Sequence, residues 1–146
     1  MNQQTPPNPG IIVRWMSRAP QLQSVLRIVF GFLFILPGTM KTFAFPVGVP
    51  PDGGTVELFS QLGIGGLMEV TGGAMLLAGL FTRPVAFILA GEMAVAYFQF
   101  HAPRGFWPIV NGGTDAMLYC FLMLYFSAAG GGPWSLDAKF RKVPRQ

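Results

Sequence analysis

The sequence has few of the side chains that a water-exposed protein needs. Only 11% of its 146 residues are charged, while 51% are hydrophobic, and soluble domains carry about 25% charged residues. It also contains one Cys and one His. A single Cys excludes an intrachain disulfide scaffold, and the high hydrophobicity excludes a disordered chain. The composition therefore predicts an integral membrane protein of one domain.

The scarcity of His and Cys also restricts redox chemistry. One His cannot provide both axial ligands of a membrane b-type haem, and Cys120 alone cannot hold an iron–sulfur cluster. No metal site is predicted, and no cofactor is assigned to the chain. Any electrons would have to pass through a quinone, a small substrate or a partner subunit.

The net charge of +4 does not indicate nucleic-acid binding. The basic residues lie between long apolar runs and near the two ends, and they are not interleaved with aromatic residues on one surface. This distribution is typical of residues that determine membrane topology. The expected partner is therefore the lipid bilayer and not nucleic acid.

Long apolar segments dominate the middle of the chain. A membrane-spanning helix needs about 20 residues, with a range of about 17–25, whereas strands are about 5–6 residues long. The fold expected is an all-α, integral membrane four-helix bundle. Its expected spans cover residues 22–45, 62–81, 85–101 and 115–131.

The same segmentation defines three parts of the chain. Residues 1–21 are polar and proline-rich and are expected to form a flexible arm. Residues 22–133 form the four-span domain, and residues 134–146 form a basic tail. Eight of the ten Lys and Arg residues lie on the side of the two ends, and only Lys41 and Arg104 lie on the other. The positive-inside rule places both ends in the cytoplasm of a multi-pass protein.

Two carboxylates lie within the predicted spans. An ionised side chain near the bilayer centre costs about 2.5–3.5 kcal/mol, so it usually faces a partner or a cavity. At a rise of about 1.5 Å per residue, Glu69 and Glu92 lie about 10 and 12 Å below the outer ends of their helices. Their similar depths indicate one shared site, with Glu69 and Glu92 as candidate catalytic residues.

The spacing of small residues predicts which way these carboxylates point. Gly65, Gly72 and Gly79 recur every seven residues and form a predicted packing stripe, and Glu69 lies on the same face. Small residues in membrane helices mark the places where helices touch. Glu92 shares a face with polar Gln99. Both carboxylates are therefore expected to point into the bundle.

Further polar residues gather toward the outer end of the bundle. Candidates for binding a substrate or an anion are Lys41, His101, Arg104, Asn111 and Asp115. If the third helix continues as an α-helix, its spacing puts His101 on the face opposite Glu92. Polar groups of this kind can also be structural, holding helices together or capping a span at the interface, and the sequence leaves that alternative open.

Several short motifs match one family. They are, in order, Leu26-Arg27-Ile28 with Gly31, Gly38-x-x-Lys41, Glu69-Val70-x-Gly72-Gly73, Gly79-Leu80-Phe81-Thr82-Arg83-Pro84, Glu92-Met93-Ala94-x-Ala96-Tyr97, His101-x-Pro103-x-Gly105-Phe106, Pro108-x-x-Asn111-Gly112-Gly113 and Gly132-x-Trp134-Ser135-Leu136-Asp137. Through them the chain resembles the DoxX family of small four-helix bacterial membrane proteins. The family usually has an acid directly after Asn-Gly-Gly, where this chain has Thr114 followed by Asp115.

The resemblance implies a four-helix protein of the bacterial inner membrane. Some relatives are subunits of thiosulfate:quinone oxidoreductases, and others resemble partners of thiol and superoxide defence. The function expected is that of a subunit or partner in membrane oxidoreduction, acting on a quinone, a small sulfur anion or a thiol, with a redox subunit or a second copy as partner. A small proton-coupled transporter and a non-catalytic assembly partner remain the alternatives.

Overall fold

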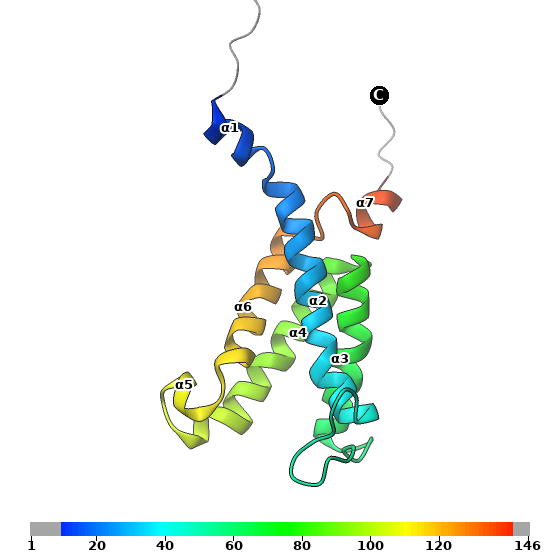
Figure 1. The fold of residues 1–146 in the computed structure, drawn as a ribbon, viewed down its shortest axis with the longest axis vertical. Helices are drawn as coiled ribbons and strands as arrows, with labels where there is room; N and C mark the ends of the chain where they lie inside the picture. The colour runs from blue at the N-terminus through cyan, green and yellow to red at the C-terminus, as the bar shows by residue number, and fades with distance from the viewer. Residues whose placement is uncertain (1–9, 142–146) are drawn as a thin grey trace, which may run out of the picture.

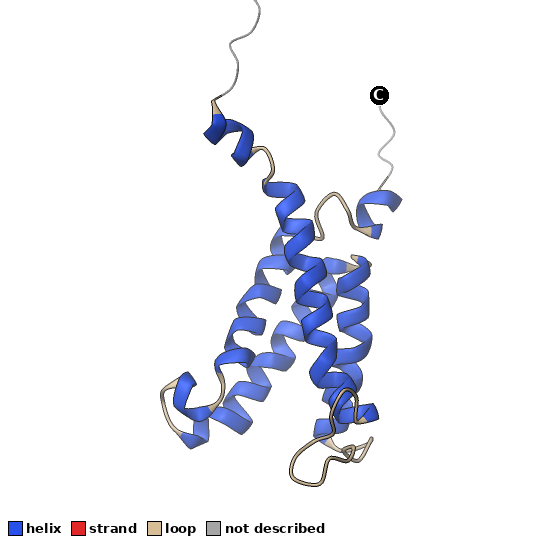
Figure 2. Cartoon of the chain, in the orientation of Figure 1, coloured by secondary structure: helices blue, strands red, loops and turns tan. Residues whose placement is uncertain are grey.

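The computed structural model describes residues 10–141, and these residues are mostly helical, without a strand (Figure 2). Four long helices run up and down along one another (Figure 1). They are α2 (Ala19–Phe43), α3 (Gln61–Ala78), α4 (Thr82–Ala96) and α6 (Thr114–Ala129). This arrangement confirms the predicted all-α membrane bundle.

Shorter helices flank and connect the bundle. They are α1 (Ile11–Met16), the π-helix η1 (Tyr97–His101), the 3-10 helix η2 (Ala102–Arg104), α5 (Pro108–Asn111) and α7 (Leu136–Phe140). Helices α1 and α7 lie at the same end of the bundle (Figure 1). The two ends of the described chain therefore share one side, as an even number of spans requires, whereas their cytoplasmic location stays a prediction.

Two of the expected segments contain more structure than their sequences suggest. The segment expected to be a flexible arm, residues 1–21, is helical from Ile11, and residues 136–140 of the expected tail form α7. The remainder of the arm (1–9) and of the tail (142–146) lies outside the described residues. The C-terminal segment gains order because Asp137 is hydrogen-bonded to the α3–α4 turn, whereas no residue of α1 is buried.

Three helical segments are long and apolar enough to cross a membrane. They are Ala19–Phe43, Gln61–Ala78 and the continuous run Thr82–Arg104, which joins α4 to η1 and η2. Helix α6 has 16 residues and is about 24 Å long, less than the roughly 30 Å hydrocarbon core of a bilayer. The sequence had predicted short third and fourth spans, and the π-helix is what extends the third.

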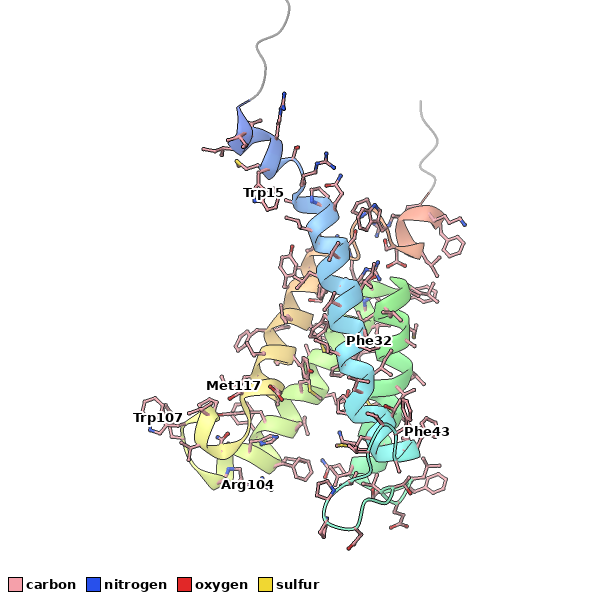
Figure 3. The ribbon with its side chains drawn as sticks, viewed as in Figure 1. Trp15, Phe32, Phe43, Arg104, Trp107 and Met117 are labelled. Atoms are coloured by element: carbon pink, nitrogen blue, oxygen red, sulfur yellow. The ribbon has the colours of Figure 1, made fainter. Side chains whose placement is uncertain are left out.

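The core is aromatic and lies between the four helices. Phe30 and Phe34 of α2 are buried, and the ring of Tyr119 from α6 packs edge-on against both at 5.3 Å between centroids. By contrast, large apolar side chains are exposed on every long helix, such as Phe32 (Figure 3), which is 56% exposed. Exposed apolar surface on every long helix is characteristic of a protein whose outer face contacts lipid.

Glycine allows α2 and α3 to pack closely. A Cβ atom at Gly31 would lie 2.7 Å from the backbone nitrogen of Leu77, and one at Gly38 would lie 2.8 Å from the carbonyl oxygen of Gly66. Any side chain at these positions would push the two backbones apart. Of the predicted stripe, Gly72 packs instead against Leu89 of α4. Small residues on α3 therefore serve two helix contacts on different faces.

Candidate functional site

A buried ion pair joins α2 to α3. The Nζ atom of Lys41 lies 2.6 Å from Oε1 and 2.7 Å from Oε2 of Glu69. Glu69 is 3% exposed, so its charge has little access to solvent. Lys41 lies in the last turn of α2, where the helix dipole favours a cation. Each ion therefore neutralises the other at a depth where an unpaired charge is unfavourable.

Two adjacent glycines on α3 make room for this cluster. A Cβ atom at Gly66 would lie 3.0 Å from Cβ and 3.4 Å from Cδ of Lys41, so the aliphatic part of Lys41 passes over this glycine. A Cβ atom at Gly65 would lie 3.3 Å from Oε1 of Glu92. The sequence predicted Gly65 as a packing residue, and the structure shows that it also faces a carboxyl group of α4.

Glu92 differs from Glu69 because part of its carboxyl group has no partner. Its Oε2 atom is buried, and no other described residue forms a hydrogen bond with it. A buried polar atom without a hydrogen bond typically costs about 1–3 kcal/mol. Such an atom calls for an explanation, and a ligand, a water or an ion that completes the hydrogen bond is one. Among the described residues the hydroxyl of Thr82, at the other end of the bundle, is also buried without a partner.

Glu92 and the ion pair line the same cavity, which has a volume of about 490 Å³. Its charged or titratable lining residues are Lys41, Glu69, Glu92, His101 and Arg104. Most of the remaining lining is apolar, including Met68 and Phe100. Figure 3 shows Arg104 near the end of the bundle opposite Trp15. The volume lies within the range of about 300–1,000 Å³ that is usual for small-molecule sites.

The π-helix η1 brings His101 to this cavity. The spacing of an α-helix predicted that His101 and Glu92 would lie on opposite faces, but both line the cavity. The wider turn of residues 97–101 changes the direction of the side chains that follow Ala96, and single π turns are frequent at functional sites. The expectation of opposite faces was wrong because it assumed a regular helix.

His101 is held in one orientation. Its Nδ1 atom lies 3.2 Å from the carbonyl oxygen of Asn111, and its ring stacks on Tyr97 with 6.4 Å between centroids. Because a carbonyl oxygen only accepts hydrogen bonds, Nδ1 carries the proton in this contact. In a neutral ring Nε2 is then free to accept a proton or a hydrogen bond.

Two candidate residues from the sequence lie outside the cavity lining. Asn111 is buried and stabilises the outer loop, since its Nδ2 donates to the carbonyl of Gly105 at 2.7 Å and its Oδ1 accepts from the amide of Gly113 at 2.8 Å. It supports the site through its own carbonyl, which contacts His101. Asp115 is exposed on the first turn of α6 and does not line the cavity.

The opposite end of the bundle contains a polar cluster that the sequence reading missed. Arg27 is fully buried, and its guanidinium donates to four backbone carbonyls. These are the carbonyls of Gly131 (2.8 Å), Leu76 (2.6 Å), Leu77 (2.5 Å) and Trp134 (2.9 Å). The sequence counted Arg27 only as a topology-determining charge. Its location inside an apolar span was the signal of a structural role.

Asp137 completes this cluster, which we call the latch (Arg27 with residues 131–137). Its carboxylate accepts hydrogen bonds from the amides of Phe81 (2.7 Å) and Thr82 (2.8 Å), and its own amide donates to the carbonyl of Gly79. Partial burial alone would raise the pKa of Asp137, but the hydrogen bonds from Thr82 and Phe81, with the charge of Arg141, hold the pKa below its usual value. The latch attaches the C-terminal segment to the α3–α4 turn.

Comparisons with known proteins agree with the fold and its motifs. The DoxX family profile matches residues 22–102, which include Lys41, Glu69, Glu92 and His101. The chain is 46% identical over 126 residues to an uncharacterised protein of Haemophilus influenzae, covering 84% of this chain and 93% of the relative. It is 24% identical over 137 residues to an uncharacterised membrane protein of Mycobacterium tuberculosis, covering 80% of each. No solved structure matches the chain. This protein, a helical membrane bundle, belongs to the DoxX family.

Proposed function

We propose that this protein is a quinone-binding subunit of a membrane oxidoreduction system, with the quinone ring in the cavity beside Glu92. The observation that carries the proposal is that Glu92 lines this cavity while its buried Oε2 atom has no hydrogen-bond partner among the described residues. A protonated carboxyl group at this position would donate a hydrogen bond to a ligand oxygen. A quinone carbonyl is an acceptor of this kind and belongs to a molecule that dissolves in the bilayer.

The charges of the cavity favour a neutral ligand over a small anion. The ammonium group of Lys41 already contacts both oxygens of Glu69, so little of its positive charge is available. A sulfur anion would also lie close to the carboxylate of Glu69, which is unfavourable in a medium of low polarity, and Arg104 is the lining cation that no described carboxylate pairs. A quinone avoids this repulsion, and its ring suits a lining that is mostly apolar.

The outer surface beside the cavity provides a route from the bilayer. Leu62 and Ile64 of α3 and Val95 of α4 line the cavity and are 43%, 50% and 47% exposed. These residues lie on the apolar exterior of predicted spans and therefore contact lipid. The isoprenoid tail of a quinone could extend over them while the ring reaches Glu92.

The same residues suit the proton chemistry of quinones. Reduction of a quinone to a quinol takes up two electrons and two protons, and a carboxyl group beside the ring can supply one of the protons. His101 lies in the same cavity, with its Nδ1 atom on the carbonyl oxygen of Asn111. The electrons would come from a donor outside this chain, such as a thiol or reduced sulfur substrate on a partner subunit.

Binding of short-chain ubiquinone and menaquinone analogues to the purified protein in micelles tests the proposal. We expect Glu92→Leu to weaken binding at least tenfold, because the hydrogen-bond donor is lost. Glu92→Gln keeps an N–H donor and should bind within threefold of the wild type. Glu57→Gln, which removes an exposed carboxylate outside the cavity lining, is the matched control and should bind normally.

Two results would overturn this function. If neither analogue binds the wild-type protein, the cavity is not a quinone site. If Glu92→Leu binds as well as the wild type, the unpartnered carboxyl oxygen does not contact the ligand, and Glu92 has only a structural role.

A further inference from the structure

A second cavity lies at the latch end and is separate from the proposed quinone site. Its volume is about 880 Å³, and it is enclosed by the α3–α4 turn, the end of α6 and α7. Two guanidinium groups line it, those of Arg83 and Arg141, together with apolar residues such as Phe81, Pro84 and Phe140. Because α3 ends and α4 begins here, the cavity lies where membrane spans reach the lipid headgroups.

The two arginines keep hydrogen-bonding capacity for a ligand. Arg83 is positioned by a hydrogen bond from Nη1 to the carbonyl of Ala128 at 2.5 Å, and it lies beside Gly130, where a Cβ atom would be 3.4 Å from Nε. A guanidinium has five N–H donors, and within residues 10–141 the side chain of Arg83 donates one hydrogen bond, that to Ala128. Within the described range, neither Arg83 nor Arg141 forms a salt bridge.

The acidic residue in this cavity compensates only part of the arginine charge. Asp137 lines the cavity and interacts electrostatically with Arg141, but it is one carboxylate against two guanidinium groups, and its oxygens accept the amides of Phe81 and Thr82. The latch end as a whole is basic among the described residues, with one carboxylate against five exposed cations: Asp137 against Arg14, Arg18, Arg83, Lys139 and Arg141. In contrast, the outer loops contain three exposed carboxylates: Asp52, Glu57 and Asp115.

We propose that this cavity binds one anionic phospholipid, with Arg83 and Arg141 on the phosphodiester and the glycerol and acyl chains on the apolar lining. Arginine forms paired hydrogen bonds to phosphate oxygens, and basic pockets at membrane interfaces select anionic headgroups. The cavity combines both elements, a pair of guanidinium groups and the exposed ring of Phe81 beside them. This gives a role to the Phe81-Thr82-Arg83-Pro84 motif, which does not line the cavity beside Glu92.

Fluorescence of Trp134 can test the site, because Trp134 adjoins Ser135 of the cavity lining. In a Trp15→Phe/Trp107→Phe background, the protein is reconstituted into phosphatidylcholine vesicles that contain a minor fraction of brominated lipid. We expect brominated phosphatidylglycerol to quench Trp134 at least threefold more than brominated phosphatidylcholine. Arg83→Gln/Arg141→Gln should remove this preference, and Arg141→Gln alone should reduce it at least twofold.

The control is Lys139→Gln, which removes one positive charge two residues before Arg141 but not from the cavity lining; it should keep the preference. The single variant Arg141→Gln keeps the test informative if the double variant fails to fold. Among the described residues the Arg141 side chain forms no hydrogen bond that this substitution would remove; the bond of Arg141 to Asp137 comes from its backbone amide. Equal quenching by the two lipids in the wild type overturns the proposal, and so does an equal loss in Lys139→Gln. If inorganic phosphate removes the preference at an ionic strength where sodium chloride does not, the site binds small anions instead of lipid.

Discussion

The two ends of the bundle both contain buried ionic groups, but they use them differently. At the latch, Arg27 donates to four backbone carbonyls and Asp137 accepts two backbone amides. At the outer cavity, Lys41 and Glu69 bind each other, while one oxygen of Glu92 has no partner among the described residues. One cluster stabilises the backbone, and the other retains an unsatisfied group beside an open volume.

This difference separates structural from functional buried charge in one molecule. At the latch the ionic groups of Arg27 and Asp137 are hydrogen-bonded to backbone atoms, so their contribution is stability. The buried polar atom without a described partner at that end is the uncharged hydroxyl of Thr82. An unpartnered group beside a cavity reduces stability, and such a group persists where a ligand supplies the missing hydrogen bond. The presence of a charged residue in a predicted span did not by itself distinguish the two ends, because Arg27 and Glu69 are both buried.

The largest expected effect is at Arg27. Arg27→Met should lower the free energy of unfolding by about 3–5 kcal/mol, because four carbonyls lose a charged donor and no water replaces it. Unfolding in mixed micelles with increasing sodium dodecyl sulfate, followed by circular dichroism, measures the change. Lys139→Met, on the exposed surface of α7, is the control, and equal stability of the two variants would show that the latch is not a structural element.

The ion pair at the outer end should show a smaller effect that can be reversed. Lys41→Met leaves Glu69 buried and unpaired, and we expect the free energy of unfolding to fall by about 3 kcal/mol. Adding Glu69→Gln removes the unpaired charge and should recover at least half of that loss in a double-mutant cycle. No side-chain substitution can rescue Arg27→Met in this way, because its partners are backbone atoms. If the stability losses of Lys41→Met and Glu69→Gln simply add in the double variant, the two side chains do not stabilise each other. The proposed difference between the ion pair and the latch would then be wrong.

The glycine contacts of α2 should matter equally at both ends. Gly31 lies about one turn from Arg27, and Gly38 lies about one turn from Lys41. Alanine at either position should destabilise the bundle by about 1–2 kcal/mol through overpacking against α3. Gly91→Ala, where a Cβ atom would meet nothing within 4 Å, should be neutral or slightly stabilising. The same unfolding measurement compares the three, and a marked inequality between Gly31 and Gly38 would mean that the ends also differ in backbone packing.

The smallest expected effect is the pH response of the latch. The folded-state pKa of Asp137 lies below its usual value, which is about 3.9 in an unfolded chain. Its stabilising contribution, about 1 kcal/mol as for a helix N-cap, is therefore complete above about pH 4 and is lost as the pH falls through the lower folded pKa. Unfolding at pH 7 and pH 3 should show this loss in the wild type but not in Asp137→Asn. Asp115→Asn, an exposed carboxylate at the other end, should respond to acid as the wild type does.

Much of the fold could be predicted because it depends on local composition. Apolar runs of spanning length located the four long helices, and their number placed both ends of the chain on one side. The family motifs identified the DoxX fold. Five of the seven polar candidates from the sequence line one cavity, namely Lys41, Glu69, Glu92, His101 and Arg104. Their common depth was predictable because the rise of a helix is constant.

The tertiary structure alone decided what each buried charge does. Arg27 contacts Gly131, which is 104 residues away, and no periodicity in the sequence connects two such positions. A single π turn brought His101 to the side of Glu92, against the regular helical spacing. The sequence determined which residues enter the membrane, because hydrophobicity is a property of each segment. Whether a buried polar side chain finds hydrogen-bond partners depends on backbone groups that distant segments bring together, because a hydrogen bond forms only over about 3 Å.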